Sequence, residues 1–143
     1  MANLSTWVVY ALLSALFAAL TAIFAKVGLK NVNPDLATAI RTAIILIITW
    51  SIVFLKKTNG EAQTLSKNNW LFLILSAVAT GLSWLFYYRA LQIGKVSEVS
   101  SIDKGSILIT ALLSFIFLKE PMTPKLLIGI GLIFAGMMVI IWK

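Results

Sequence analysis

Five long apolar runs constrain this chain more than any other feature, because each is close to the ~20 residues that a helix needs to cross a bilayer. The chain is 60% hydrophobic and only 12% charged, whereas soluble domains average about 25% charged residues. We therefore expect an all-α integral membrane protein embedded in the lipid bilayer. The runs predict one domain over residues 1–143, with membrane helices at about 7–29, 34–55, 69–93, 97–118 and 124–142.

Local signals mark several of these helix ends. Asn33 followed by Pro34 is a favourable helix start, because the amide side chain can cap and proline suits the first turn. Ser97 is the candidate cap of the fourth helix, and the pair Thr123-Pro124 is expected to start the fifth. The segment 119–121, Lys-Glu-Pro, is expected to stop the fourth helix.

The composition also excludes several classes of chemistry. The chain has no cysteine and no histidine, which removes disulfides, thiol nucleophiles and histidine-based metal sites. Its few carboxylates are not clustered as a metal site or a close catalytic pair, so we expect no enzyme, no metal and no cofactor. The net charge of +7 is typical of loop lysines at a lipid surface, and we expect no nucleic-acid partner.

The distribution of cations gives little information on orientation. Five crossings put Met1 on one side, side A, and the other end of the chain on side B. Side A then holds five cations and side B seven, of which three lie within helices, so the loops alone count five against four. A chain this balanced is able to insert in both orientations. The side B cations are Lys26, Lys30, Arg41, Arg89, Lys95, Lys104 and Lys143.

Small polar residues recur at helical spacing on the first four predicted helices, and two interpretations are open. They line a polar cavity, or their hydroxyls bond carbonyls of their own helix. The candidate lining groups are Thr80, Ser83, Tyr87, Ser106 and Thr110. The fifth helix has no such hydroxyls but has small residues that suit close packing or dimerisation, namely Gly129, Gly131, Ala135 and Gly136.

Charged residues inside membrane helices are costly, so we treat them as candidate functional groups. At ~1.5 Å rise per residue, Arg41 and Asp103 both lie roughly 10 Å inside side B and are expected to pair. Lys104 is ~100° around the helix from Asp103 and is expected to face another surface. Arg89 and Lys26 are expected to be interfacial anchors that extend their charges to side B. Glu98 suits the positive start of the fourth helix.

The stretch from Tyr87 to Ile140 resembles the second half of the five-helix EamA-type domain of the drug/metabolite transporter superfamily. The matching features are Arg89-Ala90-Leu91 before a short turn, Leu118-Lys119-Glu120 at a helix end, and the helix with Ile128-Gly129 and Ala135-Gly136. Ser101 to Lys104 is similar to the short bacterial and archaeal branch. The chain lacks the proline that larger members often have in the fourth helix, and we expect one helix over 97–118.

The resemblance implies half of a ten-helix inverted-repeat transporter in a bacterial or archaeal inner membrane. An odd-helix unit must pair with an inverted copy, so the expected assembly is an antiparallel homodimer that moves a small metabolite or drug-like solute by alternating access. Arg41, Arg89 and Lys104 outnumber Asp103 and Glu98, which favours an anionic or zwitterionic substrate or a lipid headgroup. The alternatives are a lipid-headgroup flippase and a non-transporting accessory subunit. The proton–cation exchange of small multidrug resistance transporters does not carry over, because the first helix has no acidic residue.

Overall fold

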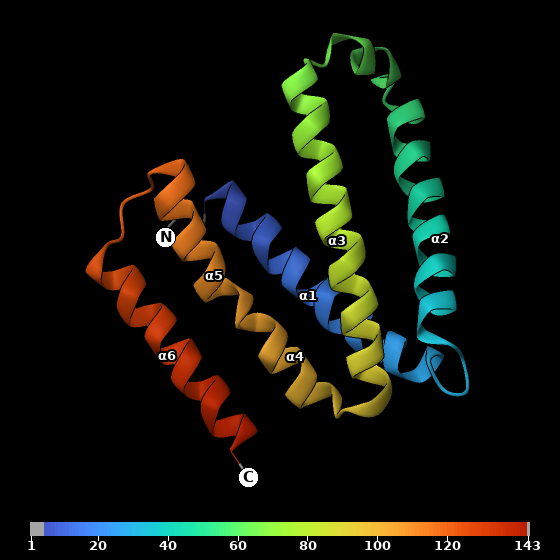
Figure 1. Ribbon diagram of the computed structural model, residues 1–143. Helices are drawn as coiled ribbons and strands as arrows, with labels where there is room; N and C mark the ends of the chain where they lie inside the picture. The colour runs from blue at the N-terminus through green and yellow to red at the C-terminus, as the bar shows by residue number, and fades with distance from the viewer. Residues whose placement is uncertain (1–4, 143) are drawn as a thin grey trace. The chain divides into compact units, whose positions relative to one another are not determined.

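The computed structural model describes residues 5–142, and every regular element in that part of the chain is helical (Figure 1). Five helical segments are long and apolar enough to cross a membrane, as expected for an all-α membrane protein. Lys143, which was counted on side B, lies outside the described residues. The helices are α1 (Thr6–Gly28), α2 (Pro34–Leu55), η1 (Asn59–Thr64), α3 (Lys67–Ile93), α4 (Val96–Lys104), α5 (Ser106–Leu113), η2 (Ser114–Leu118) and α6 (Pro124–Ile141).

Two of the three predicted helix starts are confirmed, and each has a capping side chain. The Asn33 side chain accepts hydrogen bonds from the backbone N–H groups of Asp35 and Leu36, at 2.8 and 3.2 Å. The Thr123 hydroxyl accepts one from the N–H of Leu126 at 3.2 Å. Each cap is followed directly by proline, so the sequence ends each loop and starts the helix within two residues.

The third predicted cap is wrong. The extended residue before α4 is Lys95, which has φ −74° and ψ 139°, and its side chain makes no capping bond. The helix therefore begins at Val96, and Ser97 lies inside the first turn, where its carbonyl accepts the Ser101 hydroxyl at 2.7 Å.

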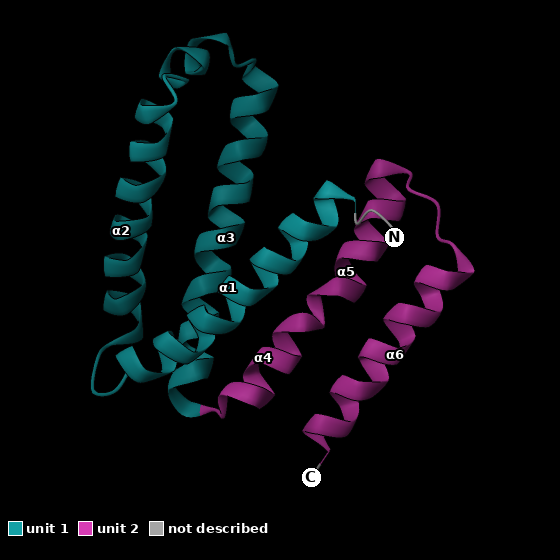
Figure 2. Cartoon of the chain, turned by 180° about the vertical axis from the view of Figure 1, so that it is seen from behind, with its two compact units in different colours: residues 1–93 teal, residues 94–143 magenta. Residues whose placement is uncertain are grey.

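The chain divides into two compact units, residues 5–93 and residues 94–142, each of which is described by itself (Figure 2). In the first unit α3 packs against both α1 and α2. Its buried residues are few and mostly small or apolar: Ala22, Ala25, Leu29, Thr38, Tyr88 and Leu91. Most large apolar side chains are exposed instead, which is the pattern expected of helices whose outer faces contact lipid.

In the second unit α4 and α5 both pack against α6. The expected fourth span is confirmed as Val96–Leu118, but its α-helix is not continuous. The α-helix is interrupted at Gly105, where i→i+3 bonds replace the normal ones: Gly105 donates to Ile102 at 2.9 Å and Leu108 donates to Gly105 at 3.1 Å. A Cβ on Gly105 would lie 2.9 Å from the Ile102 carbonyl oxygen and 3.0 Å from the sulfur of Met137 on α6. Glycine therefore permits the interruption without proline.

The end of this span is also irregular. Residues Ser114–Leu118 form a π-helical turn, and Lys119 follows with a left-handed φ of 56°. The Glu120 N–H bonds the Ser114 carbonyl at 3.3 Å, so the chain leaves the helix before Pro121. The expected stop at 119–121 is confirmed.

Candidate functional site

The guanidinium of Arg41 on α2 lies over two aromatic rings of α3. Its carbon atom is 4.1 Å from the centre of the Trp84 ring and 5.4 Å from that of Tyr88. The two rings share one face of α3 because they are four residues apart. Cation–π contacts of this kind stabilise a cation by about 0.5–2 kcal/mol, more as water is excluded.

This arrangement was partly accessible from the sequence. Arg41 is seven residues from the start of α2, and Trp84 and Tyr88 are nine and five residues from the end of α3. Because consecutive antiparallel helices bring that start and that end to one side, the three residues lie at similar depth. The cost of a charge within a membrane helix singled out Arg41, whereas no local pattern singled out Trp84 or Tyr88.

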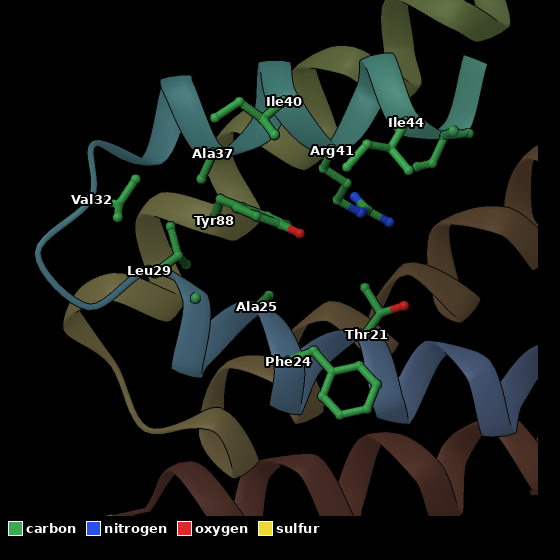
Figure 3. A pocket seen from close by; sticks show the side chains of 12 residues that line it. Thr21, Phe24, Ala25, Leu29, Val32, Ala37, Ile40, Arg41, Ile44 and Tyr88 are labelled. Carbon is green, nitrogen blue, oxygen red and sulfur yellow. The ribbon is translucent and has the colours of Figure 1, made fainter. Parts of the chain in front are cut away.

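Arg41 and Tyr88 also border a cavity of about 480 Å³ within the first unit. Figure 3 shows the Arg41 side chain extending into the space between α1 and α2, with Phe24 and Thr21 on the opposite wall. The remaining walls are almost entirely apolar, with Ala37, Ile40 and Ile44 among them. The cavity is thus an apolar chamber with a single cation on its wall.

Several threonine hydroxyls of this unit bond carbonyls of their own helix, which is the second of the two interpretations given above. Thr38, Thr42 and Thr80 each donate a hydrogen bond to the carbonyl four residues earlier, all at 2.8 Å. None of the candidates Thr80, Ser83 and Tyr87 borders the 480 Å³ cavity. Thr21 does, although its hydroxyl also donates to its own helix, to the Phe17 carbonyl at 2.8 Å. The polar part of the wall is therefore mainly Arg41 and Tyr88.

Asp103 and Lys104 occupy the last turn of α4, directly before the interruption at Gly105. Their charged atoms are 3.6 Å apart, although Lys104 is exposed and Asp103 is only partly exposed. The Cα directions do diverge, but the long lysine side chain folds back toward its neighbour. Ser106 and Thr110 follow on α5, where both are exposed. Arg41 and Asp103 belong to different units, and their pairing stays a prediction.

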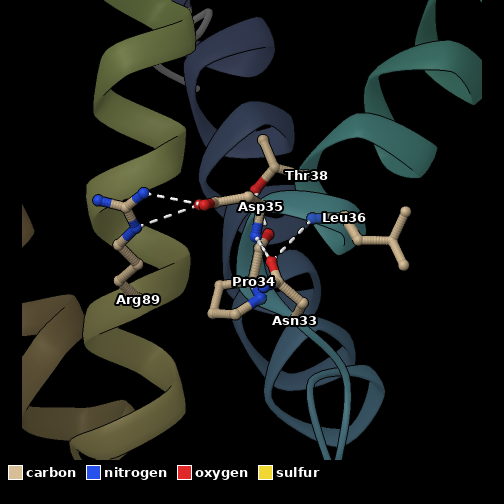
Figure 4. Close-up of polar contacts among 6 residues, drawn as sticks. All are labelled: Asn33, Pro34, Asp35, Leu36, Thr38 and Arg89. Atoms are coloured by element: carbon tan, nitrogen blue, oxygen red, sulfur yellow. Dashed lines mark hydrogen bonds and ion pairs between the residues drawn. The ribbon is translucent and has the colours of Figure 1, made fainter.

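Arg89, which was expected to be an interfacial anchor, is not free but is held in an ion pair near side B. Its Nε and Nη2 donate to the two carboxylate oxygens of Asp35, at 3.1 and 2.9 Å (Figure 4). The pair joins the start of α2 to the end of α3, and both side chains are about half exposed, at 50% and 54%. The sequence is compatible with this ion pair, because Asp35 and Arg89 have opposite charges and both lie near side B.

Lys26 is likewise not a free anchor. Its ammonium donates to the carbonyls of Leu91 and Gln92 at 2.6 and 3.4 Å, at the end of α3. A cation there satisfies carbonyls that have no partner within the helix and complements the helix dipole. The Gln92 side chain in turn donates to the Val32 carbonyl at 3.0 Å. These bonds fix one end of the cavity.

The carboxylate Glu98 lies in the first turn of α4, as expected, and its partner is Lys95 at 3.0 Å. Within residues 5–142, no three His, Cys, Asp or Glu side chains gather closely enough to hold a metal ion. The charged groups thus form separate pairs, and Arg41 with its aromatic rings forms the most distinctive polar site of the first unit.

Comparison with known proteins decides the family. The model of the EamA-like transporter family matches residues 5–142, nearly the whole chain. The chain belongs to the EamA-like transporter family. It is a multi-pass membrane protein of a family of transporters, as the resemblance from Tyr87 to Ile140 implied. No solved structure matches it.

Two relatives are similar to this chain over nearly their whole length. An uncharacterized transporter of the cobO 3′ region in Sinorhizobium sp. is 44% identical over 131 residues, covering 92% of this chain and 93% of its own. An uncharacterized protein of Methanocaldococcus jannaschii is 34% identical over 140 residues, covering 96% and 97%. The uncharacterized transporter YxxF of Bacillus subtilis is 27% identical over 131 residues, but these cover 91% of this chain and only 40% of YxxF.

The glycines of α6 have no close neighbours within the part of the chain that the structure describes. A Cβ added at Gly129, Gly131 or Gly136 would meet no atom within 4 Å among the neighbours that the structure describes. This differs from Gly105, which is crowded. The α6 glycines therefore have room for a further helix to approach.

Proposed function

We propose that this EamA-type protein moves a small metabolite or drug-like solute across the inner membrane of a bacterial or archaeal cell by alternating access. Membership of a transporter family over residues 5–142 carries the proposal. The 480 Å³ cavity with Arg41 on its wall supports it, because solute sites in membrane bundles combine apolar walls with a few polar groups.

The working unit is an antiparallel homodimer, two inverted copies of one five-helix domain spanning residues 1–143. An inverted repeat needs a second unit when the number of helices is odd. The match to only 40% of YxxF supports this, because a longer relative has room for two such units in one chain. The open glycine face of α6 supplies a surface for close helix contact.

The interrupted span α4–α5 is the moving or coupling element in this proposal. In inverted-repeat transporters the solute and ion sites are typically built at discontinuous helices. Asp103, directly before the interruption, acts as proton acceptor, with Lys104 as its charge partner. The hydroxyls of Ser106, Thr110, Thr80 and Ser83 and the ring of Tyr87 line the path.

Replacing Asp103 with asparagine is expected to abolish the pH dependence of transport, because the amide cannot take up a proton. Equal amounts of wild type and Asp103→Asn are reconstituted in proteoliposomes, and uptake of labelled benzenesulfonate and choline is measured from pH 6 to 8. Asp103→Glu, which keeps the carboxylate, is the matched control and should retain the pH dependence.

Two results would contradict the proposal. Unchanged uptake and unchanged pH dependence in Asp103→Asn would remove Asp103 from the mechanism. Absence of protein-dependent uptake of both solutes would remove solute transport, and translocation of labelled lipid in the same vesicles would then identify a flippase. An accessory subunit would show neither activity.

A further inference from the structure

We infer that the 480 Å³ cavity of the first unit binds an amphipathic anion, an acidic group on an apolar body, with Arg41 as the cation that holds the acidic group. The inference rests on the proposed transport function and names its substrate class. A free organic anion and an anionic lipid share this chemistry, and the experiment below distinguishes them.

The first step is that Arg41 has no carboxylate partner in its own unit. Residues 5–93 contain two acidic side chains, Asp35 and Glu61. Asp35 is engaged on both oxygens by Arg89, and Glu61 lies in η1, beyond the opposite end of α2. In the second unit Asp103 has Lys104 beside it. The positive charge of Arg41 is therefore not compensated by any carboxylate of the first unit.

The second step is that the aromatic rings do not replace an anion. The guanidinium carbon lies over the rings of Trp84 and Tyr88, and the face of an aromatic ring offers no acceptor oxygen to its N–H groups. Within the first unit no acceptor atom bonds those N–H groups, so they are available to a ligand. A carboxylate, phosphate or sulfonate accepts two parallel bonds from such a fork.

The third step is the shape and polarity of the cavity. Its volume lies within the range of roughly 300–1,000 Å³ that is usual for small-molecule sites. Phe24, Ile40 and Ile44 give it apolar walls, and Figure 3 shows the Tyr88 hydroxyl directed into the same space. An anion with an apolar tail matches this surface, and a cation does not, because the cavity lining contains no carboxylate.

The test compares three ligands that share an eight-carbon tail and carry heads of different charge. These are octanesulfonate (negative), octanol (neutral) and octyltrimethylammonium (positive). Binding is followed by the fluorescence of Trp84 in a protein whose Trp7, Trp50, Trp70 and Trp142 are replaced by phenylalanine, in phosphatidylcholine nanodiscs. Empty nanodiscs correct for partition of the tail into lipid.

We expect octanesulfonate to bind at least about tenfold more tightly than octanol, and octyltrimethylammonium more weakly than either. Arg41→Gln should remove the preference for the anion, and Arg41→Lys, which keeps the charge but not the fork, should retain part of it. Equal affinities of the three ligands for the parent protein would overturn the inference, whatever the variants do. So would an anion preference that survives in Arg41→Gln.

The source of the anion follows from a second set of nanodiscs that contains one third phosphatidylglycerol. Competition by that lipid against octanesulfonate identifies an anionic lipid as occupant, and an unchanged affinity identifies a free organic anion. Both results support the inferred site. Anion binding without uptake of benzenesulfonate or choline would leave the site standing and remove the transport function. Uptake of either solute without a preference for the anion would overturn the site and leave the transport function standing.

Discussion

Replacing Gly105 with alanine is expected to lower the free energy of unfolding by about 1–3 kcal/mol, the usual cost of forcing extra volume into a packed site. The added methyl would lie 2.9 Å from the Ile102 carbonyl and 3.0 Å from the Met137 sulfur. The backbone oxygen cannot yield without disturbing α4, so the chain must shift. Equilibrium unfolding in mixed detergent micelles, followed by circular dichroism, measures the change.

Gly81 in α3 is the matched control, because a Cβ there would meet no described neighbour within 4 Å. Gly81→Ala should be neutral or stabilising, since alanine favours a helix over glycine by up to about 1 kcal/mol. Adding Met137→Ala to Gly105→Ala should restore only the part of the loss that comes from the sulfur contact. Equal stability of Gly105→Ala and Gly81→Ala would contradict the close packing at Gly105.

The second large effect is expected at Lys26. Lys26→Met keeps an unbranched side chain, one atom shorter, but removes the ammonium that bonds the carbonyls of Leu91 and Gln92. Leu91 is fully buried, so its carbonyl loses a partner in a place that water reaches poorly. Hydrogen bonds to charged groups are worth about 1.5–3 kcal/mol, and a loss of that order is expected in the same unfolding measurement.

Lys30→Met provides the comparison for this prediction. Lys30 is exposed and lies four residues after Lys26, so the substitution removes the same charge and adds the same apolar group. It should leave the free energy of unfolding almost unchanged. If the two variants lose stability equally, the effect is one of net charge, and the bond to the end of α3 contributes nothing.

Much of the helical architecture could be predicted from the sequence because its signals are local. Apolar runs of membrane length predicted all five spans, which the structure confirms. The caps at Asn33 and Thr123 and the stop at Lys119 each depend on residues within three or four positions. Such features require no knowledge of which helices are neighbours.

The interruption at Gly105 could not be predicted in the same way. A glycine inside an apolar run is compatible with a continuous helix, and only the close approach of Met137 on α6 reveals why glycine is needed. The same holds for Lys26 and Arg89, whose partners lie 65 and 54 residues away along the chain. Side-chain reach between helices, rather than periodicity, decides these contacts.

The candidate site was predictable in part. The cost of a charge inside a membrane helix correctly directed attention to Arg41. The hydroxyl stripes were less informative, because a serine or threonine in a helix has an acceptor of its own four residues earlier. The sequence predicted a polar cavity, whereas the cavity of the first unit is apolar and depends on one cation and its aromatic neighbours.

The most direct test of an inverted homodimer is the topology of the C-terminal residue Lys143. A reporter active only in the cytoplasm and one active only outside the inner membrane are fused to it separately, and their signals are compared at equal expression. We predict that both reporters are active, because the loop cations are nearly balanced, five against four, and the chain inserts both ways. Activity of only one reporter would contradict the antiparallel homodimer and would require a separate, oppositely oriented partner.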